Sequence, residues 1–193
     1  MSVYGEDIPV SAMGVVMKVS QILVSVVLGL ATGILPIVSY NYGSKQYDRV
    51  KKLYKYALLI GTLVMTVSCL VLELFPAQIV SIFGTQNELY MDFAKQCMQI
   101  YMAATFSVGV SIVTGIFFQS IDKPIQSMVL SLLRQIIVLV PAVILLGLSG
   151  NVLTVLWAGP ISDSASCIAS LIAIIGCWKS IFNKENTNEK NQQ

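Results

Sequence analysis

The dominant pattern along the chain is a series of long apolar runs separated by short polar linkers. Each run holds about twenty residues or more, which is the length that an α-helix needs to cross the hydrocarbon core of a bilayer. The pattern therefore predicts an all-α integral membrane protein with about five transmembrane helices, and the lipid bilayer as its first partner. The expected spans are residues 12–40, 56–75, 97–120, 125–148 and 152–178.

The segments outside these spans are short and carry their own predictions. Residues 1–11 are interpreted as an outer loop, and the polar residues 179–193 as a disordered cytoplasmic tail. Between Phe75 and Asp92 the sequence is apolar, is interrupted by Pro76, and then becomes polar. This predicts a short helix at the outer membrane interface. Its lipid- or protein-facing residues would be Ile79, Val80, Ile82 and Phe83.

Composition supports a membrane protein and excludes several function classes. Of the 193 residues, 55% are hydrophobic and 11% are charged, against about a quarter charged in an average soluble domain. The net charge of +2 gives no reason to expect nucleic acid as a partner. The chain has no histidine, its four cysteines occur singly, and no nucleophile is paired with a base. We therefore expect no enzymatic activity, no metal site and no cofactor.

The distribution of Lys and Arg predicts the orientation in the plasma membrane. The linker after the first span is strongly basic, the third linker carries Lys123, and the tail carries Lys179 and two further lysines. The second linker has Lys95 with two acidic residues, and the fourth linker has no basic residue. Because basic loops stay in the cytoplasm, the amino terminus is expected outside and the carboxyl terminus inside.

Polar side chains inside the apolar runs are the candidate functional residues, since burying one in a bilayer costs about 2.5 to 3.5 kcal/mol at the helix centre on insertion scales. Lys18 is interpreted as an anchor that reaches toward the interface. The substrate- or ion-pathway candidates are Gln21, Asn41, Gln119, Arg134 and Asp163.

Asp163 follows the dipeptide Gly159-Pro160, which is expected to interrupt the fifth span. A broken helix at mid-membrane often lines a cavity that binds ions or substrates. A hydrogen bond between helices is an equally open role for Asp163. Arg134 lies on the fourth span at a depth that differs by several ångströms at 1.5 Å per residue, so a direct ion pair is compatible with the sequence but does not follow from it.

Gly29 and Gly33 form a Gly-x-x-x-Gly pair that is followed by Pro36. Small residues at this spacing favour close helix packing, and an internal proline favours a bend. We expect this helix to pack tightly and to bend, with Pro160 bending the fifth span.

The stretch Pro36-Ile-Val-Ser-Tyr-Asn-Tyr-Gly-Ser-Lys45 resembles the Pro-Ile-x-x-Tyr-Asn-Tyr-Gly-Ala-Lys signature of MATE (multidrug and toxic compound extrusion) transporters. Two further regions agree in order and spacing. They are Phe117-Phe-Gln-Ser-Ile-Asp-Lys-Pro124, followed by Leu130-Ser-Leu-Leu-Arg-Gln135, and Trp157-Ala-Gly-Pro-Ile-Ser-Asp163. The resemblance implies a partial carboxyl-terminal lobe, equivalent to helices 8–12 of a twelve-helix, two-lobe transporter.

The resemblance also implies a function: efflux of cationic, amphipathic drugs by alternating access, driven by sodium ions or protons. The third span lacks the carboxylate that some family members carry there, Leu35 replaces a common glutamine, and Asp122 replaces a common glycine. Any coupling carboxylate is then expected in the missing amino-terminal lobe, supplied in cis or in trans. We expect that the chain is a fragment or split product and does not transport alone.

Two other interpretations stay open. One is a flippase of lipid-linked sugars with a related fold, although only Lys18 and Arg134 would supply positive charge within its spans. The other is a non-transporting membrane remnant or assembly protein.

Overall fold

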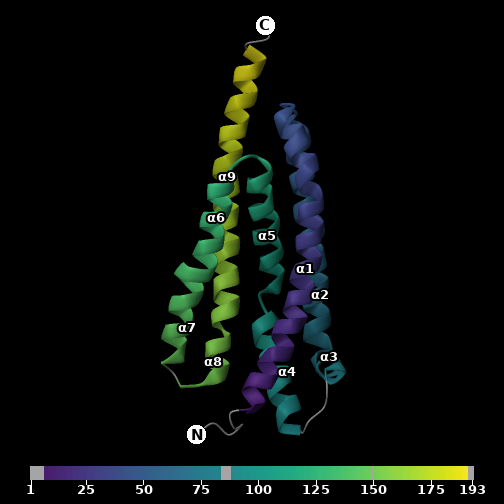
Figure 1. The fold of residues 1–193 in the computed structure, drawn as a ribbon, viewed down its shortest axis with the longest axis vertical. Helices are drawn as coiled ribbons and strands as arrows, with labels where there is room; N and C mark the ends of the chain where they lie inside the picture. The colour runs from purple at the N-terminus through teal and green to yellow at the C-terminus, as the bar shows by residue number, and fades with distance from the viewer. Residues whose placement is uncertain (1–6, 84–87, 149, 191–193) are drawn as a thin grey trace.

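The structure is a computed structural model that describes residues 7–83, 88–148 and 150–190. Within these residues the chain is helical and contains no strand. The long helices run side by side along one axis, with α5 in the middle (Figure 1). The elements are α1 (Asp7–Gly43), α2 (Tyr47–Leu74), α3 (Pro76–Ile82), α4 (Glu88–Met102), α5 (Thr105–Ser120), α6 (Pro124–Leu132), the π-helix η1 (Leu133–Leu139), α7 (Val140–Gly147), α8 (Val152–Leu156) and α9 (Ala158–Lys190).

The expected all-α membrane architecture is confirmed. In the described part of the chain, four helical segments are long and apolar enough to cross a membrane. A fifth span results if α4 and α5, which are bent by 44° at their junction, are counted as one. The predicted third span, 97–120, therefore starts earlier, at Glu88. The apolar pattern does not reveal the first part of this span, α4, because charged and apolar residues alternate along it. Asp92 and Lys95 are on its exposed side, whereas Phe93 and Met98 are buried.

The basic linker after the first span is mostly helix rather than loop. The turn itself is short, and its backbone amides bond back to α1, Ser44 to the carbonyl of Tyr40 at 3.0 Å and Gln46 to that of Asn41 at 2.9 Å. The span predicted from residue 56 therefore begins at Tyr47. Arginine and lysine are good helix formers, so a run of positive charge ends the apolar pattern without ending the helix.

Both predicted terminal segments need correction. The outer loop 1–11 is helical from Asp7 onward, and residues 1–6 lie outside the described part. The tail predicted as disordered from residue 179 continues α9 as far as Lys190, and residues 191–193 are not described. The sequence after Gly176 holds no glycine or proline, so nothing in it interrupts the helix.

The predicted short interfacial helix is α3, which begins with Pro76 at its first position, where a missing N–H breaks no helical hydrogen bond. Within α3 the side chain of Val80 is fully buried, whereas Ile82 is 78% exposed. One side of α3 therefore packs on the bundle and the other side faces outward.

The interior contains two apolar clusters. The first lies between α1, α2, α5 and α9 around Met65 and Phe118, and the second lies between α1 and α4 around Phe93 and Met98. The helices α2 and α5 pack closely at a pair of glycines, where a Cβ on Gly109 would lie 3.0 Å from the carbonyl oxygen of Gly61. Most of the outer surface is also apolar, as a chain surrounded by lipid requires.

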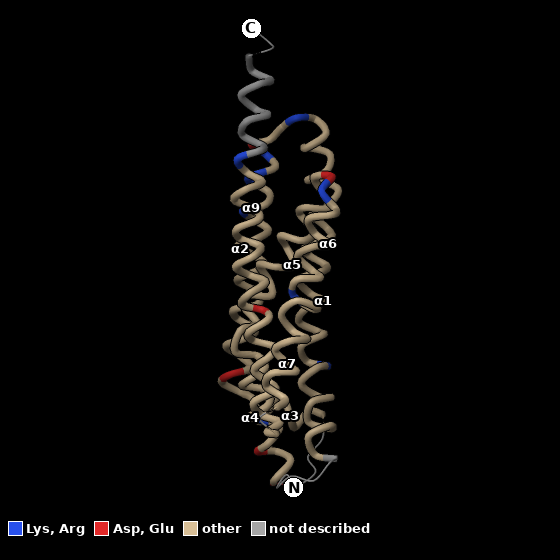
Figure 2. The backbone as a smooth tube through the Cα atoms, turned by 90° about the vertical axis from the view of Figure 1, so that its left-hand side faces the viewer, with Lys and Arg blue, Asp and Glu red and all other residues tan. Residues whose placement is uncertain are grey.

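The basic linkers gather at one end of the bundle. Figure 2 shows Lys and Arg concentrated at the end where the carboxyl terminus lies, while the amino terminus lies at the opposite end. The α1–α2 turn, the α5–α6 turn and the end of the fifth span thus share one side, as the charge count requires. The assignment of this side to the cytoplasm stays a prediction.

Candidate functional site

An ion pair between Arg134 and Asp163 lies within the membrane region. One terminal nitrogen of Arg134 lies 2.7 Å from Oδ1 of Asp163. The carboxylate is the more buried partner, since the side chain of Asp163 is 11% exposed and that of Arg134 is 31% exposed. The pair that the sequence leaves undecided is therefore formed. It joins the fourth span to the fifth.

Arg134 lies at the start of the π-helix η1. The fourth span is α-helical to Leu132, is a π-helix over Leu133–Leu139, and then becomes α-helical again. In a π-helix the hydrogen bonds join residues five apart, so the turn is wider and the side chains after it face a new direction. Counting depth at 1.5 Å per residue places the two backbones at different depths, and the long side chain of Arg134 bridges that difference.

The fifth span is interrupted close to its predicted break. The short α8 ends at Leu156, Trp157 separates it from α9, and Pro160 falls in the first turn of α9. Proline is tolerated there because the first-turn amides have no helical acceptor. Gly159 packs closely on α4, since a Cβ at this position would lie 3.0 Å from the ring of Tyr101. Asp163 follows one turn later.

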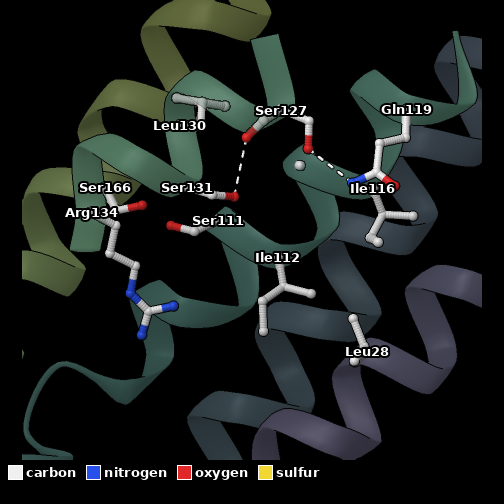
Figure 3. Close-up of a pocket in the computed structure, with 11 residues that line it drawn as sticks. Leu28, Ser111, Ile112, Ile116, Gln119, Ser127, Leu130, Ser131, Arg134 and Ser166 are labelled. Carbon is white, nitrogen blue, oxygen red and sulfur yellow. Dashed lines mark hydrogen bonds between the residues drawn. The ribbon is translucent and has the colours of Figure 1, made fainter. Parts of the chain in front are cut away.

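A pocket of about 220 Å³ lies beside the ion pair, and Arg134 forms part of its lining. The other polar side chains are contributed by α5, α6 and α9, whereas α1 contributes Leu28. Gln119 and Arg134 lie at opposite ends of the pocket, with serine hydroxyls between them (Figure 3). The lining residues are Leu28, Ser111, Ile112, Gly115, Ile116, Gln119, Ser127, Leu130, Ser131, Arg134 and Ser166.

Hydrogen bonds hold the polar wall of the pocket in place. The amide nitrogen of Gln119 donates to the hydroxyl of Ser127 at 2.9 Å, and the hydroxyl of Ser131 donates to the carbonyl oxygen of Ser127 at 3.1 Å (Figure 3). Ser111 donates to the carbonyl oxygen of Ser107 at 3.3 Å. A hydroxyl that has donated its proton keeps oxygen lone pairs, so Ser111 and Ser131 present acceptors to a bound molecule.

A second polar surface follows the outside of α1. Lys18, Gln21 and Ser25 line an open groove of about 660 Å³ together with Phe83, which follows α3. Gln21 therefore does not lie with Gln119, Arg134 and Asp163, and the structure separates the predicted pathway residues into two regions.

Gly29 and Gly33 lie on α1 and do not form the expected close helix contact within the described part of the chain. A Cβ on either glycine would meet no atom within 4 Å. The helix also continues through Pro36 to Gly43. The close packing expected for this face has no partner in the described residues, so it stays a prediction for whatever covers α1.

Asn41 has a local structural role. It is 8% exposed, and its side-chain nitrogen donates to the carbonyl oxygen of Ile37 at 2.8 Å. Its own carbonyl oxygen accepts from the amide of Gln46. Asn41 closes the end of α1 and is not among the residues that line the pocket.

Sequence reasoning missed most of the pocket wall. Ser111, Ser127 and Ser131 were not among the candidates, although Ser127 and Ser131 are four residues apart and therefore on one helix face. This spacing is the signal that could have indicated them. The described residues contain no group of three or more His, Cys, Asp or Glu side chains that could hold a metal ion.

Comparison with known proteins identifies the family. A family model described as MatE matches residues 1–144. The chain belongs to the MatE family. The MATE multidrug transporter DinF-BH is 32% identical in sequence and superposes on 89% of this chain with a TM-score of 0.80. An inward-facing MATE family multidrug resistance transporter of the MOP superfamily, 15% identical, has a TM-score of 0.75 over 89% of the chain and shows the fold alone.

Curated relatives agree with this MatE assignment but are much longer. The FAD transporter of Shewanella oneidensis is 23% identical over 160 residues, which are 83% of this chain and 35% of that protein. An uncharacterized protein of Mycoplasma genitalium is 27% identical over 127 residues, 23% of its length. The chain likewise covers 38% of the DinF-BH chain. It therefore spans well under half of the relatives that it matches.

Proposed function

We propose that this MatE chain forms part of one lobe of an ion-coupled efflux transporter in the plasma membrane, and that the complete transporter exports cationic, amphipathic compounds by alternating access. The observation that carries the proposal is the likeness to DinF-BH, at 32% identity and a TM-score of 0.80 over 89% of the chain. Sodium ions or protons would drive export, with no cofactor and no catalytic residue involved.

The two polar surfaces fit a role on a transport path. The pocket beside Arg134 offers hydroxyl and amide groups within an apolar bundle. The groove on α1 presents Lys18, Gln21 and Ser25 on a face that no described helix covers. Polar residues on an otherwise lipid-facing surface are costly, so we expect a second lobe to cover this face and to enclose the path.

Alternating access needs two bodies that move relative to each other around a shared site. Within the described residues, four or five spans form a bundle around α5. We therefore expect transport only when an amino-terminal lobe is present, in cis or in trans. Because Asp163 is already paired with Arg134, we also expect the coupling carboxylate to lie in that second lobe.

A different cargo is favoured by one relative. The FAD transporter of Shewanella oneidensis matches 83% of this chain, and an anionic nucleotide would be attracted by Lys18, whereas the charge of Arg134 is already balanced by Asp163. A flippase of lipid-linked sugars would need more positive charge around its path than these two residues provide. A non-transporting assembly protein or remnant is the alternative in which the pocket has no substrate.

Everted membrane vesicles test the proposal. The chain is expressed alone and together with any coding sequence that lies in frame upstream of Met1, and uptake of the cationic dye ethidium is measured under an imposed proton or sodium gradient. FAD loading is measured in parallel. We expect gradient-dependent ethidium uptake only with the longer product. Uptake of FAD but not ethidium would support the nucleotide alternative, and uptake by the chain alone would overturn the need for a second lobe.

A further inference from the structure

The pocket beside Arg134 carries polar groups along its length but has no net charge. Among the described residues that line it, Arg134 alone is charged, and Asp163 balances that charge at 2.7 Å. An ion that enters such a pocket loses its hydration water and meets no net opposite charge. The electrostatics of the pocket therefore favour an uncharged ligand.

Two side chains bring hydrogen-bond donors to the pocket that no described residue accepts. A guanidinium carries five N–H groups, and a carboxylate can accept two of them in a fork, so Arg134 keeps donors beyond those that Asp163 uses. Ser166 is 2% exposed, lines the pocket and forms no hydrogen bond with the described residues. A buried hydroxyl without a partner is unusual, because it has given up its hydrogen bonds to water. Both groups call for a ligand with acceptor atoms.

The same pocket also presents acceptors. The hydroxyls of Ser111 and Ser131 donate to carbonyl oxygens of their own helices at 3.3 and 3.1 Å, which leaves their oxygen lone pairs for a ligand. The side-chain nitrogen of Gln119 donates to Ser127, and its side-chain oxygen is left as an acceptor. The ligand should therefore carry O–H or N–H donors as well as acceptors.

These polar groups recur along the helices and do not converge on one point. Ser127, Ser131 and Arg134 are spaced by four and three residues, so they follow one helix face. Ser111 and Gln119 are two turns apart on α5, and one turn advances about 5.4 Å. Gln119 and Arg134 lie at opposite ends of the row (Figure 3). A ligand with a single polar head would satisfy one part of this wall, whereas a chain with repeated hydroxyls satisfies all of it.

The apolar side of the pocket consists of Leu28, Ile112 and Ile116 (Figure 3). We propose that the pocket binds an uncharged polyhydroxyl chain, with its hydroxyls on the polar wall and its C–H groups on this apolar side. The site deepens the proposed exporter function and rests on it in one respect, that the bound chain is the uncharged part of a cargo whose charged group is held by the second lobe. Binding is measured without transport, so its absence would leave the efflux proposal standing, and absence of efflux would leave the binding site standing.

Three compounds of equal chain length separate the effect of charge from that of the hydroxyls. Sorbitol is uncharged, gluconate ends in a carboxylate, and glucamine ends in an ammonium group. The full chain is purified in a detergent without a sugar head group, and binding of tritiated sorbitol is measured by equilibrium dialysis at neutral pH. We expect saturable binding that unlabelled sorbitol displaces, and about tenfold weaker displacement by gluconate and by glucamine, because an ion loses hydration in this pocket.

Serine variants test whether the polar wall forms the site. Ser111→Ala with Ser131→Ala removes two hydrogen-bonding groups and should weaken sorbitol binding about tenfold or more. Ser81→Ala is the control, because the Ser81 hydroxyl also donates to a carbonyl oxygen of its own helix, that of Gln78 at 2.7 Å, but lies on α3 outside the pocket. Its affinity should equal that of the parent. Circular dichroism compares the helix content of the variants, and Ser131→Ala alone replaces the double variant if that loses helix.

Three results would overturn the proposal. Absence of saturable sorbitol binding to the parent chain would show that the pocket holds no polyol. Displacement by gluconate or glucamine that equals or exceeds displacement by sorbitol would show that the pocket does not select an uncharged chain. Unchanged affinity of the folded serine variant would place the sorbitol site elsewhere.

Discussion

Removing one partner of the Arg134–Asp163 pair should destabilise the bundle more than removing both charges. The atoms are 2.7 Å apart, and the carboxylate is the more buried of the two. We consider Arg134→Gln, Asp163→Asn and the double variant. Asparagine keeps nearly the shape of aspartate, whereas glutamine is shorter than arginine, so the double variant removes both charges together with part of the reach of residue 134.

The size of each effect follows from burial. Breaking a buried ion pair by removing one partner costs about 3 to 5 kcal/mol, because the remaining charge has no counterion. Arg134→Gln leaves Asp163 in that position, and we expect a loss of about 3 kcal/mol. Asp163→Asn leaves Arg134 facing a polar pocket, so we expect a loss of about 1 to 2 kcal/mol. The double variant should lie within about 1 kcal/mol of the parent.

Thermal unfolding of the purified chain in detergent measures these differences, since 1 kcal/mol shifts Tm by about 2 to 4 °C for a chain of this size. Arg134→Gln should lower Tm by about 6 to 12 °C, and the double variant should restore most of the loss. The cycle then gives a coupling of about 2 kcal/mol or more. Additive effects of the two single changes would refute the pair.

Two further predictions test the packing and the orientation. Gly109→Ala should cost about 1 to 3 kcal/mol of stability, because its Cβ would lie 3.0 Å from the carbonyl oxygen of Gly61. Gly29→Ala is the control: its Cβ has open space, so Tm should be unchanged or slightly raised. Equal losses of Tm would contradict the close approach of α2 and α5. In a background without the native cysteines, Ser81→Cys should react with an impermeant maleimide on intact cells and Ser44→Cys only after permeabilisation; labelling of both from outside would contradict the topology.

Hydropathy predicts the existence of the spans because the bilayer demands long apolar runs, but it predicts their ends poorly. Charged residues at a membrane surface can continue a helix, as residues 47–55 of α2 and the tail to Lys190 do. The bend between α4 and α5 and the change to a π-helix at Leu133 leave no mark in the apolar pattern.

The sequence singles out candidate residues but not their arrangement. Arg134, Asp163 and Gln119 stand out because polar side chains are costly in a membrane. Their arrangement could not be read from the sequence, because depth counted along two helices leaves out the reach of a long arginine side chain. The serines of the pocket do not stand out in the sequence, because a serine can lie in an apolar run when its hydroxyl donates to a carbonyl oxygen of its own helix. Ser131 donates to Ser127 in this way.

The most direct test of the account asks whether the pocket beside Arg134 lies on the transport path. Ser131 lines this pocket, whereas Ile136, five residues later on the same span, is 58% exposed on the outer surface. Ser131→Trp and Ile136→Trp are introduced into the longer product that transports, and gradient-dependent ethidium efflux is measured at equal expression and helix content. The account predicts at least a tenfold loss of efflux for Ser131→Trp and an unchanged rate for Ile136→Trp. Equal efflux by both variants would contradict it.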